Sequence, residues 1–253
     1  MSVPFLLTAA QMRRIQPHFP LSHGMPRVDD RRVLSGIIFV IKAGLRWRDA
    51  PPAYGPHKTL YNRFIRWTRM GVFSRIFHAL AGEADTPDRL IIDSTHLKAH
   101  RTAASLLKRG LPPRCIGRTK GGLNSKLHAV CDGAGRPVAM LLTEGQMNDQ
   151  KGANILVPFL PRARELLADR AYDSNPFRTA LAERGISACI PGRKNRKQPI
   201  KYDKALYKQR YRVEIMFGRL KDWRRIATRY DRCAANFFGA ITLAAIVSFW
   251  LKQ

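Results

Sequence analysis

The stretch RLIIDSTHLKAH, residues 89–100, is where the pattern of the chain changes from helical to strand. It opens with an apolar run that ends at Asp93, and a short apolar run of this kind predicts a buried β-strand. A carboxylate beside buried strand residues loses hydration unless another group compensates for its charge. The stretch therefore predicts the first strand of a sheet, with Asp93 as a candidate functional carboxylate.

Strand patterns alternate with helical ones after this stretch. The predicted elements are a hairpin over 125–145 turning at DGAG, a helix over 149–160, a strand over 164–173, a helix from Ser174 to Arg184, a strand over 186–191, a basic loop over 192–204, a helix over 204–226 and a final apolar helix. Their order is that of a ribonuclease-H-like α/β fold, in which helices flank a mixed sheet. We predict such a domain for residues 89–253.

The chain before this stretch, residues 1–88, is predicted to be a separate helical region. Asp29 or Asp30 can cap a helix that Gly44 ends, and KTLYNRFIRWTRMG, residues 58–71, predicts a second helix. The polar side chains on the outside of that second helix include Lys58, Thr59, Arg63 and Arg66. A helix, a loop and a basic helix resemble a helix-turn-helix, although the loop is longer than usual. An ordinary helical bundle with a solvated basic face is the alternative.

The charge of the chain indicates a polyanionic partner. The sequence has 45 Lys and Arg against 18 Asp and Glu, which gives a formal net charge of +27. Residues 1–88 hold 13 basic and 6 acidic residues, and residues 89–253 hold 32 and 12, so both parts are basic. Self-repulsion of this size is tolerable mainly when a polyanion such as nucleic acid neutralises it. On charge alone, a protein that binds RNA without reading its sequence remains an alternative.

Cysteine usage and hydropathy indicate the compartment. The four cysteines lie far apart without the spacing of metal ligands, which predicts reduced thiols and no zinc site. The apolar run AITLAAIVSFWL, residues 240–251, is too short to cross a bilayer and predicts a buried helix. We expect a cytoplasmic protein with no membrane partner.

Two further carboxylates join Asp93 as candidates. Asp169 follows the apolar run LLA much as Asp93 follows LII, and Glu214 lies within KALYKQRYRVEIMFGRLKDWRRI, residues 204–226. Three carboxylates in a domain that binds a polyanion suit phosphoryl transfer assisted by two Mg²⁺ ions. Mg²⁺ prefers oxygen ligands and takes only one or two protein carboxylates, so few acidic residues are needed.

The helix around Glu214 predicts which side chains share its face. At about 100° per residue, Tyr207, Arg210 and Lys221 fall within one angular sector with Glu214. The alternative is a Glu214 that only pairs with Arg210 on a solvated helix, an interaction of about 0.3 to 0.5 kcal/mol.

The same four residues carry a family resemblance. Tyr207, Arg210, Glu214 and Lys221 reproduce the Y-(2)-R-(3)-E-(6)-K signature of DDE transposases from bacterial insertion sequences. LLADRAYDS around Asp169 looks like the D-x-A/G-Y-D block of these proteins. The segments IIDSTHLKAHR and GRTKGGLNSKLHAV resemble insertion sequence family five, and KTLYNRFIRW resembles the N-terminal domain of that group. The resemblance spans most of the chain.

The resemblance implies a mechanism and its cofactors. Asp93, Asp169 and Glu214 would be the ligands of two divalent metal ions, Mg²⁺ with Mn²⁺ as a substitute. They would support nicking at the transposon ends and attack of the freed 3′ hydroxyl on target DNA. Arg210 and Lys221 would contact phosphates or flipped bases near the cut, and Tyr207 would support that surface.

The resemblance also implies partners. The DNA partners would be the terminal inverted repeats and the target, and the protein would act as a dimer or higher oligomer, because two ends must be joined. It would work at the bacterial nucleoid.

Two other functions remain open. A metal-dependent nuclease of the same fold would cut DNA without strand transfer, and inverted repeats flanking the gene would argue against it. A non-catalytic DNA-binding protein descended from a transposase would keep its activity after substitution of the three carboxylates.

Several polar residues near the candidate site have simpler expected roles. Asp173 is expected to cap the helix beginning near Ser174, and Asn148 and Asp149 to cap the helix from Gln150. The basic segment GRKNRK, residues 192–197, is expected to contact phosphates or to be solvated.

Overall fold

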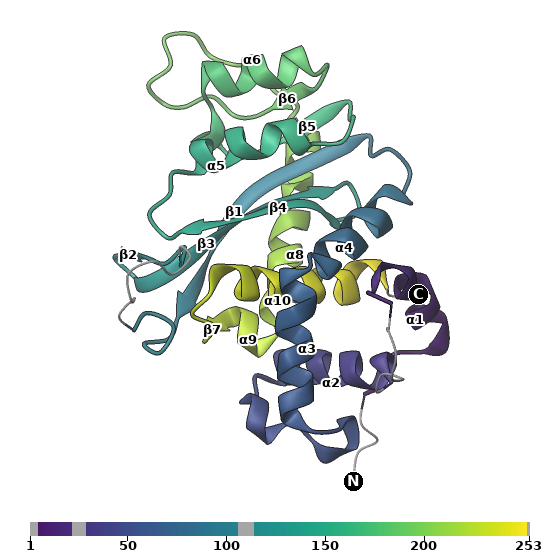
Figure 1. Cartoon of the computed structure of the whole chain (residues 1–253). Helices are drawn as coiled ribbons and strands as arrows, with labels where there is room; N and C mark the ends of the chain where they lie inside the picture. Colours follow the sequence, from purple (N-terminus) through teal and green to yellow (C-terminus); the bar gives the residue numbers. More distant parts are fainter. Residues whose placement is uncertain (1–4, 22–28, 106–113, 252–253) are drawn as a thin grey trace.

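The computed structural model describes residues 5–21, 29–105 and 114–251. In Figure 1 the sheet and its covering helices form one half of the molecule and the N-terminal helices the other. The N-terminal elements are α1 (Ala9–Ile15), η1 (Gln16–His18), α2 (Asp30–Ala43), η2 (Trp47–Asp49), η3 (Pro52–Tyr54), α3 (His57–Arg69) and α4 (Val72–Gly82). As predicted, Asp29 caps α2, accepting a hydrogen bond from the Arg31 N–H, and Gly44 ends the helix at a φ of 76°.

The described residues form one seven-stranded sheet around its longest strands. The strands are β1 (Arg89–Ala99), β2 (Gly117–Thr119), β3 (Gly122–Asp132), β4 (Pro137–Glu144), β5 (Glu165–Leu167), β6 (Ser187–Cys189) and β7 (Thr228–Arg229). β1 pairs antiparallel with β3 and parallel with β5, while β4 pairs with β3 and β6 with β5. The predicted mixed sheet and the hairpin turn at DGAG are therefore confirmed.

Helices cover both faces of this sheet. They are α5 (Asp149–Leu156), α6 (Asn175–Glu183), α7 (Lys204–Tyr207), α8 (Tyr211–Lys221), α9 (Arg224–Ala227) and α10 (Ala234–Ala245), with the shorter turns η4 (Val157–Phe159), η5 (Arg170–Tyr172), η6 (Lys208–Arg210) and the π-helical η7 (Ile246–Trp250). Leu90 and Ile92 of β1 pack in the cluster that contains α5 and α6, whereas Ile91 and Leu97 pack in the cluster that contains α8. Because successive side chains alternate between faces, Asp93 turns toward α8 and Ser94 toward α5.

Helix α10 joins the N-terminal helices to the sheet. It lies between them in Figure 1, and its apolar side chains share one buried cluster with α2, α3, α4 and α8. Gly239 of α10 approaches α3 so closely that an added Cβ would lie 2.7 Å from the Thr68 hydroxyl oxygen. The apolar run near residue 250 is a buried helix, as predicted, and the division of the chain at residue 88 remains a prediction.

The prediction of a single helix over 204–226 is wrong. The segment consists of α7, the 3₁₀ turn η6, α8 and α9. The second break occurs where Trp223 turns into the core, with only 2% of its surface exposed, and its indole N–H donates to Ser248 Oγ. Tertiary packing of Trp223 thus overrides the helical pattern. Within the described ranges, no helix is both long and apolar enough to cross a membrane.

Candidate active site

The centre of the candidate site is an arginine between two carboxylates. Arg210 Nη1 donates to Asp93 Oδ2 over 2.6 Å, and Arg210 Nη2 donates to Glu214 Oε1. The side chains of Arg210 and Asp93 are 19% and 20% exposed, whereas that of Glu214 is 58% exposed. The predicted salt bridge between Glu214 and Arg210 is therefore present, but it also reaches Asp93 on the sheet, so it is not confined to a solvated helix.

Asp93 is held in surroundings that disfavour its charge. Burial raises the pKa of the Asp93 carboxyl, and the nearby charge of Asp169 raises it further. The Ser94 N–H, which donates to Asp93 Oδ1 over 2.8 Å, and the Arg210 guanidinium oppose this rise in pKa. A cation placed among these carboxylates would offset the cost of burying them.

Asp169 lies in the turn that follows β5. Its backbone begins the 3₁₀ turn η5, and its Oδ1 accepts a hydrogen bond of 2.8 Å from the Ala171 N–H. The predicted strand over 164–173 is shorter, Glu165–Leu167, and the chain turns after it. Asp169 therefore stands just beyond the end of a strand parallel to β1, near enough for its charge to act on Asp93.

A polar network on the opposite face of β1 was missed from the sequence. Ser94 Oγ donates to Asp149 Oδ1 over 2.6 Å, and Lys126 Nζ donates to the same oxygen over 3.2 Å. Lys126 is only 8% exposed and also donates to the Met147 carbonyl. Asn148 alone is the predicted cap of α5, so the expectation that Asp149 only caps this helix is wrong. No local sequence pattern indicated this network, because the burial of Lys126 in β3 depends on α5 lying against that strand.

Tyr172 connects the two faces of the candidate site. Its hydroxyl oxygen is buried. Burial raises the pKa of Tyr172, and the charges of Asp93, Asp149 and Asp169 raise it further, while a hydrogen bond with the Ser94 side chain acts to lower it. The charges of three carboxylates thus act on one buried hydroxyl.

The remaining residues of the signature differ in how closely they approach the carboxylates. Lys221 Nζ donates to Thr95 Oγ1 over 2.6 Å, and burial lowers the pKa of this lysine. Thr95 lies two residues after Asp93 on the same face of β1, so Lys221 borders the site. Tyr207 packs edge-on against Tyr202, with ring centroids 5.4 Å apart.

The predicted DNA contacts on α3 lie on a separate surface. Lys58 and Arg66 are exposed, and Thr59 and Arg63 are half-buried. The Arg63 guanidinium carbon is 6.0 Å from the centre of the Trp67 ring, which suits a cation–π contact. Lys58 and Arg66 are therefore more accessible to a partner than Arg63.

The ligand chemistry of the site suits hard divalent cations, but the present positions of the side chains do not form a complete ligand set. Asp93 and Asp169 supply carboxylate oxygens in a partly desolvated place, which is the ligand chemistry of Mg²⁺ and Mn²⁺. Among the residues that the structure describes, no three His, Cys, Asp or Glu side chains are arranged to share one metal ion. The guanidinium of Arg210 instead lies between Asp93 and Glu214.

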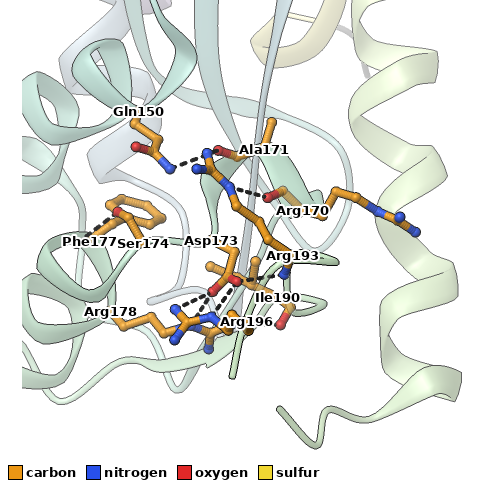
Figure 2. Close-up of polar contacts among 10 residues, drawn as sticks. All are labelled: Gln150, Arg170, Ala171, Asp173, Ser174, Phe177, Arg178, Ile190, Arg193 and Arg196. Atoms are coloured by element: carbon orange, nitrogen blue, oxygen red, sulfur yellow. Dashed lines mark hydrogen bonds and ion pairs between the residues drawn. The ribbon is translucent and has the colours of Figure 1, made fainter. Parts of the chain in front are cut away.

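Asp173 departs from its expected role, and the basic segment 192–197 is largely solvated, as one of its two expected roles required. Ser174 is the cap of α6, whereas the Asp173 carboxylate binds Arg178 and Arg196 (Figure 2). Arg193 and Arg196 of the basic segment therefore bind within the protein. The prediction that Asp173 caps the helix is wrong, because the Ser174 hydroxyl already accepts the hydrogen bond from the helix end.

Comparisons with known proteins identify the family. A family model described as "Transposase DDE domain" matches residues 85–250, and one described as "Putative transposase of IS4/5 family" matches residues 7–77. The "Putative transposase for insertion sequence element IS6501" of Brucella ovis is 34% identical over 131 residues, which cover 51% of this chain and 100% of that protein. The corresponding protein for IS402 of Burkholderia cepacia is 30% identical over 173 residues, 64% of this chain and 74% of that protein.

A solved structure shows the same fold. The piggyBac transposase in a synaptic complex with hairpin DNA matches with a TM-score of 0.53 at 12% identity, over 95% of this chain and 70% of that chain. The predicted α/β fold of the ribonuclease-H-like type is thereby confirmed. Because the DDE model covers more than half of the sequence, the chain belongs to the DDE transposases of insertion sequences, enzymes that cleave DNA, transfer its strands and use divalent metal ions.

Proposed function

We propose that Asp93, Asp169 and Glu214 are the catalytic carboxylates of this transposase and that they hold two Mg²⁺ ions, with Mn²⁺ as a substitute. The observation that carries the proposal is the contact of one guanidinium, that of Arg210, with both Asp93 on β1 and Glu214 on α8. Two carboxylates from distant parts of the sequence thus already share one cation. The charge of Asp169 also acts on Asp93, since it raises the pKa of that carboxyl.

The side chains of the site have separate roles in this proposal. When bound, the divalent ions supply activation of the attacking oxygen and stabilisation of the leaving oxygen. Asp93 and Asp169 hold fixed positions through the Ser94 and Ala171 N–H groups, which keep their carboxylates oriented before DNA binds. Arg210 balances the negative charge and can turn to a DNA phosphate, because a guanidinium binds phosphate as well as carboxylate.

We further propose two surfaces for DNA. Beside the carboxylates, Tyr207, Arg210 and Lys221 contact the strand near the cut. On α3, Lys58, Thr59, Arg63 and Arg66 contact the terminal inverted repeat, with the exposed Lys58 and Arg66 as the main phosphate contacts. The net charge of +27 supports both surfaces, and binding should weaken steeply with salt as counterions are released.

The organisation and assembly of the protein follow from the same reaction. We propose that residues 1–88 bind the transposon ends and residues 89–253 carry out the chemistry. Two ends must be joined to one target, so the active form is a dimer or higher oligomer on DNA. The protein would act in the bacterial cytoplasm, at the nucleoid.

The proposal is tested with labelled terminal-repeat DNA, target DNA and Mg²⁺ or Mn²⁺. The unmodified protein should nick the end and form a joined product. Asp93→Ala, Asp169→Ala and Glu214→Gln should each lose nicking while still binding the end in a gel-shift assay. Nicking that survives Glu214→Gln would remove this residue from the site.

Matched substitutions and the product pattern complete the test. Asp203→Asn changes an exposed carboxylate that caps α7 and should leave nicking intact, which separates loss of one charge from loss of the site. Nicking without a joined product under any condition would favour the nuclease alternative.

A further inference from the structure

Asp173 is a buried carboxylate four residues after Asp169. Its side chain has no exposed surface, and four hydrogen bonds converge on its two oxygens (Figure 2). Oδ1 accepts from Arg178 Nε over 2.8 Å and from Arg196 Nη2 over 2.7 Å. Oδ2 accepts from Arg196 Nε over 2.6 Å and from the Arg193 N–H over 2.8 Å. Burial alone would raise the pKa of Asp173, but the hydrogen bonds from Arg196 and Arg178 hold it well below its usual range, so the carboxylate is charged at neutral pH.

The side chain of Arg193 connects the Asp173 carboxylate, which binds the Arg193 N–H, to the turn after β5. Its Nη2 donates to the Ala171 carbonyl over 2.8 Å and its Nε to the Arg170 carbonyl over 3.3 Å. Gln150 Nε2 of α5 donates to the same Ala171 carbonyl over 3.0 Å. Figure 2 shows Gln150 and Arg193 converging on this carbonyl from different elements, while the Arg170 side chain points away.

The other side of the same residue holds the candidate catalytic carboxylate. The Ala171 N–H donates to Asp169 Oδ1 over 2.8 Å. Arg193 and Gln150 therefore fix the backbone of Ala171 through its carbonyl. The N–H of the same residue orients the Asp169 carboxylate. Hydrogen bonds at the Arg193 N–H, the Arg193 side chain and the Ala171 N–H, joined through the covalent structure of these two residues, thus connect Asp173 to Asp169.

Arg193 and Arg196 of the basic segment use their guanidinium groups for these internal hydrogen bonds. Arg196 uses both Nε and Nη2 on Asp173, in the two-pronged geometry that is strongest for a guanidinium and a carboxylate. Arg178 of α6 also binds the chain just before the segment, because its Nη2 donates to the Ile190 carbonyl over 2.7 Å. Lys194, exposed in the same segment, remains turned to solvent. The geometry thus favours an internal role for Arg193 and Arg196 over contact with DNA phosphates.

We infer that Asp173, together with Arg193 and Arg196, is a positioning device that fixes the orientation of the Asp169 carboxylate for DNA cleavage. The inference rests on the proposed catalytic role of Asp169. Groups that orient a metal-binding side chain through hydrogen bonds typically change metal affinity or activity by about 10- to 100-fold when they are lost. Asp173→Asn replaces an acceptor oxygen by an NH₂ group that faces arginine donors, and so breaks one side of the device while preserving its shape.

Three measurements test the inference on the full chain. They are the nicking rate at saturating end DNA, the affinity for that DNA, and the affinity of the DNA-free protein for Mn²⁺ by calorimetry. Asp173→Asn should lower the nicking rate and the Mn²⁺ affinity by about 10- to 100-fold and leave DNA affinity unchanged. Arg196→Gln should do the same, and Arg196→Lys should restore part of the loss. Lys194→Ala removes a solvent-facing charge from the same segment and should leave the saturated rate and the Mn²⁺ affinity unchanged.

Arg193→Ala keeps the inference testable if Asp173→Asn fails to fold. Arg193 is exposed, and this substitution removes only the link to the Arg170 and Ala171 carbonyls. It should lower the nicking rate and speed hydrogen exchange in residues 165–175, without a comparable change in β1. A wild-type rate and Mn²⁺ affinity in Arg193→Ala or Asp173→Asn, or a loss confined to DNA affinity, would overturn the inference. Nicking that persists in Asp169→Asn would instead refute the role of Asp169 itself.

Discussion

The Lys126 ammonium is a buried cation, and the carboxylate that balances its charge is Asp149, the first residue of α5. The two acceptors of the ammonium are the Met147 carbonyl and Asp149, and Asp149 also accepts the hydroxyl hydrogen of Ser94. Since the Ser94 N–H holds Asp93, this network orients a candidate catalytic carboxylate from the face of the sheet opposite α8. Charge and hydrogen bonding, and not only packing, therefore determine where α5 sits on the sheet.

Asp149→Asn tests this network at the level of one atom. The change leaves Lys126 buried with a neutral partner, so the unfolding free energy should fall by about 1–3 kcal/mol, and the nicking rate should fall because Ser94 is less firmly held. Urea denaturation and single-turnover nicking measure the two effects. Asn148→Ala is the matched control, since loss of the α5 cap should cost about 1 kcal/mol and leave nicking unchanged. Equal nicking rates in the two variants would contradict the prediction.

Arg210 should compete with divalent ions for the carboxylates. In Arg210→Gln, Asp93 and Glu214 lose the cation that they share, so the metal-free protein should melt at a lower temperature. The rise in melting temperature on adding Mn²⁺ should be larger than in the unmodified protein, because a ligand that binds the folded state more tightly stabilises it more. Arg219→Gln, which lowers the net charge equally on the exposed side of α8 near Phe249, should leave the Mn²⁺ response unchanged. A smaller response in Arg210→Gln than in Arg219→Gln would refute this competition.

Close contact between helices depends on particular glycines. A Cβ added at Gly36 of α2 would lie 2.6 Å from the Tyr54 Cβ and 2.8 Å from the Tyr54 Cγ, and the Tyr54 Cβ cannot move without displacing η3. At Gly218 of α8, the equivalent position has no atom within 4 Å apart from the neighbouring backbone of its own helix. The two glycines occupy helix interiors in opposite environments.

Paired alanine substitutions should therefore shift stability in opposite directions. Gly36→Ala should lower the unfolding free energy by about 1–3 kcal/mol through overpacking. Gly218→Ala should raise it by about 0.5–1 kcal/mol, since alanine loses less conformational freedom than glycine in a helix. Urea denaturation of both variants measures the difference, and a stabilising Gly36→Ala would show that α2 is not packed as described.

The sequence predicts elements better than it predicts how they meet. The strand through Asp93 and the α5 cap at Asn148 follow from local patterns, so they could be predicted. The short strand β7 and the break at Trp223 could not, because each depends on a partner far along the chain. The candidate carboxylates were found from spacing and a family signature, whereas Lys126 and its network become apparent only when β3 and α5 are adjacent.

The whole molecule has one large core that extends across the predicted boundary at residue 88. The apolar faces of α2, α3 and α4 are covered by α10, which follows the entire sheet in sequence. A fragment of residues 1–88 should consequently lack a cooperative thermal transition and show reduced helicity by circular dichroism. Joining residues 234–251 to it through a flexible linker should restore both. A cooperative transition in the isolated fragment would show that this part folds on its own.

Because α8 and α10 come late in the sequence, the active site can form only near the end of synthesis. A growing polypeptide that has been translated through β6 already contains Asp93, Asp169 and many basic side chains, but it lacks Glu214 and the helix that closes the core. Domains generally fold as units during synthesis, so this one should complete its folding only after α10 has left the ribosome. A nascent transposase could then bind nucleic acid through its charge well before it is able to cut it.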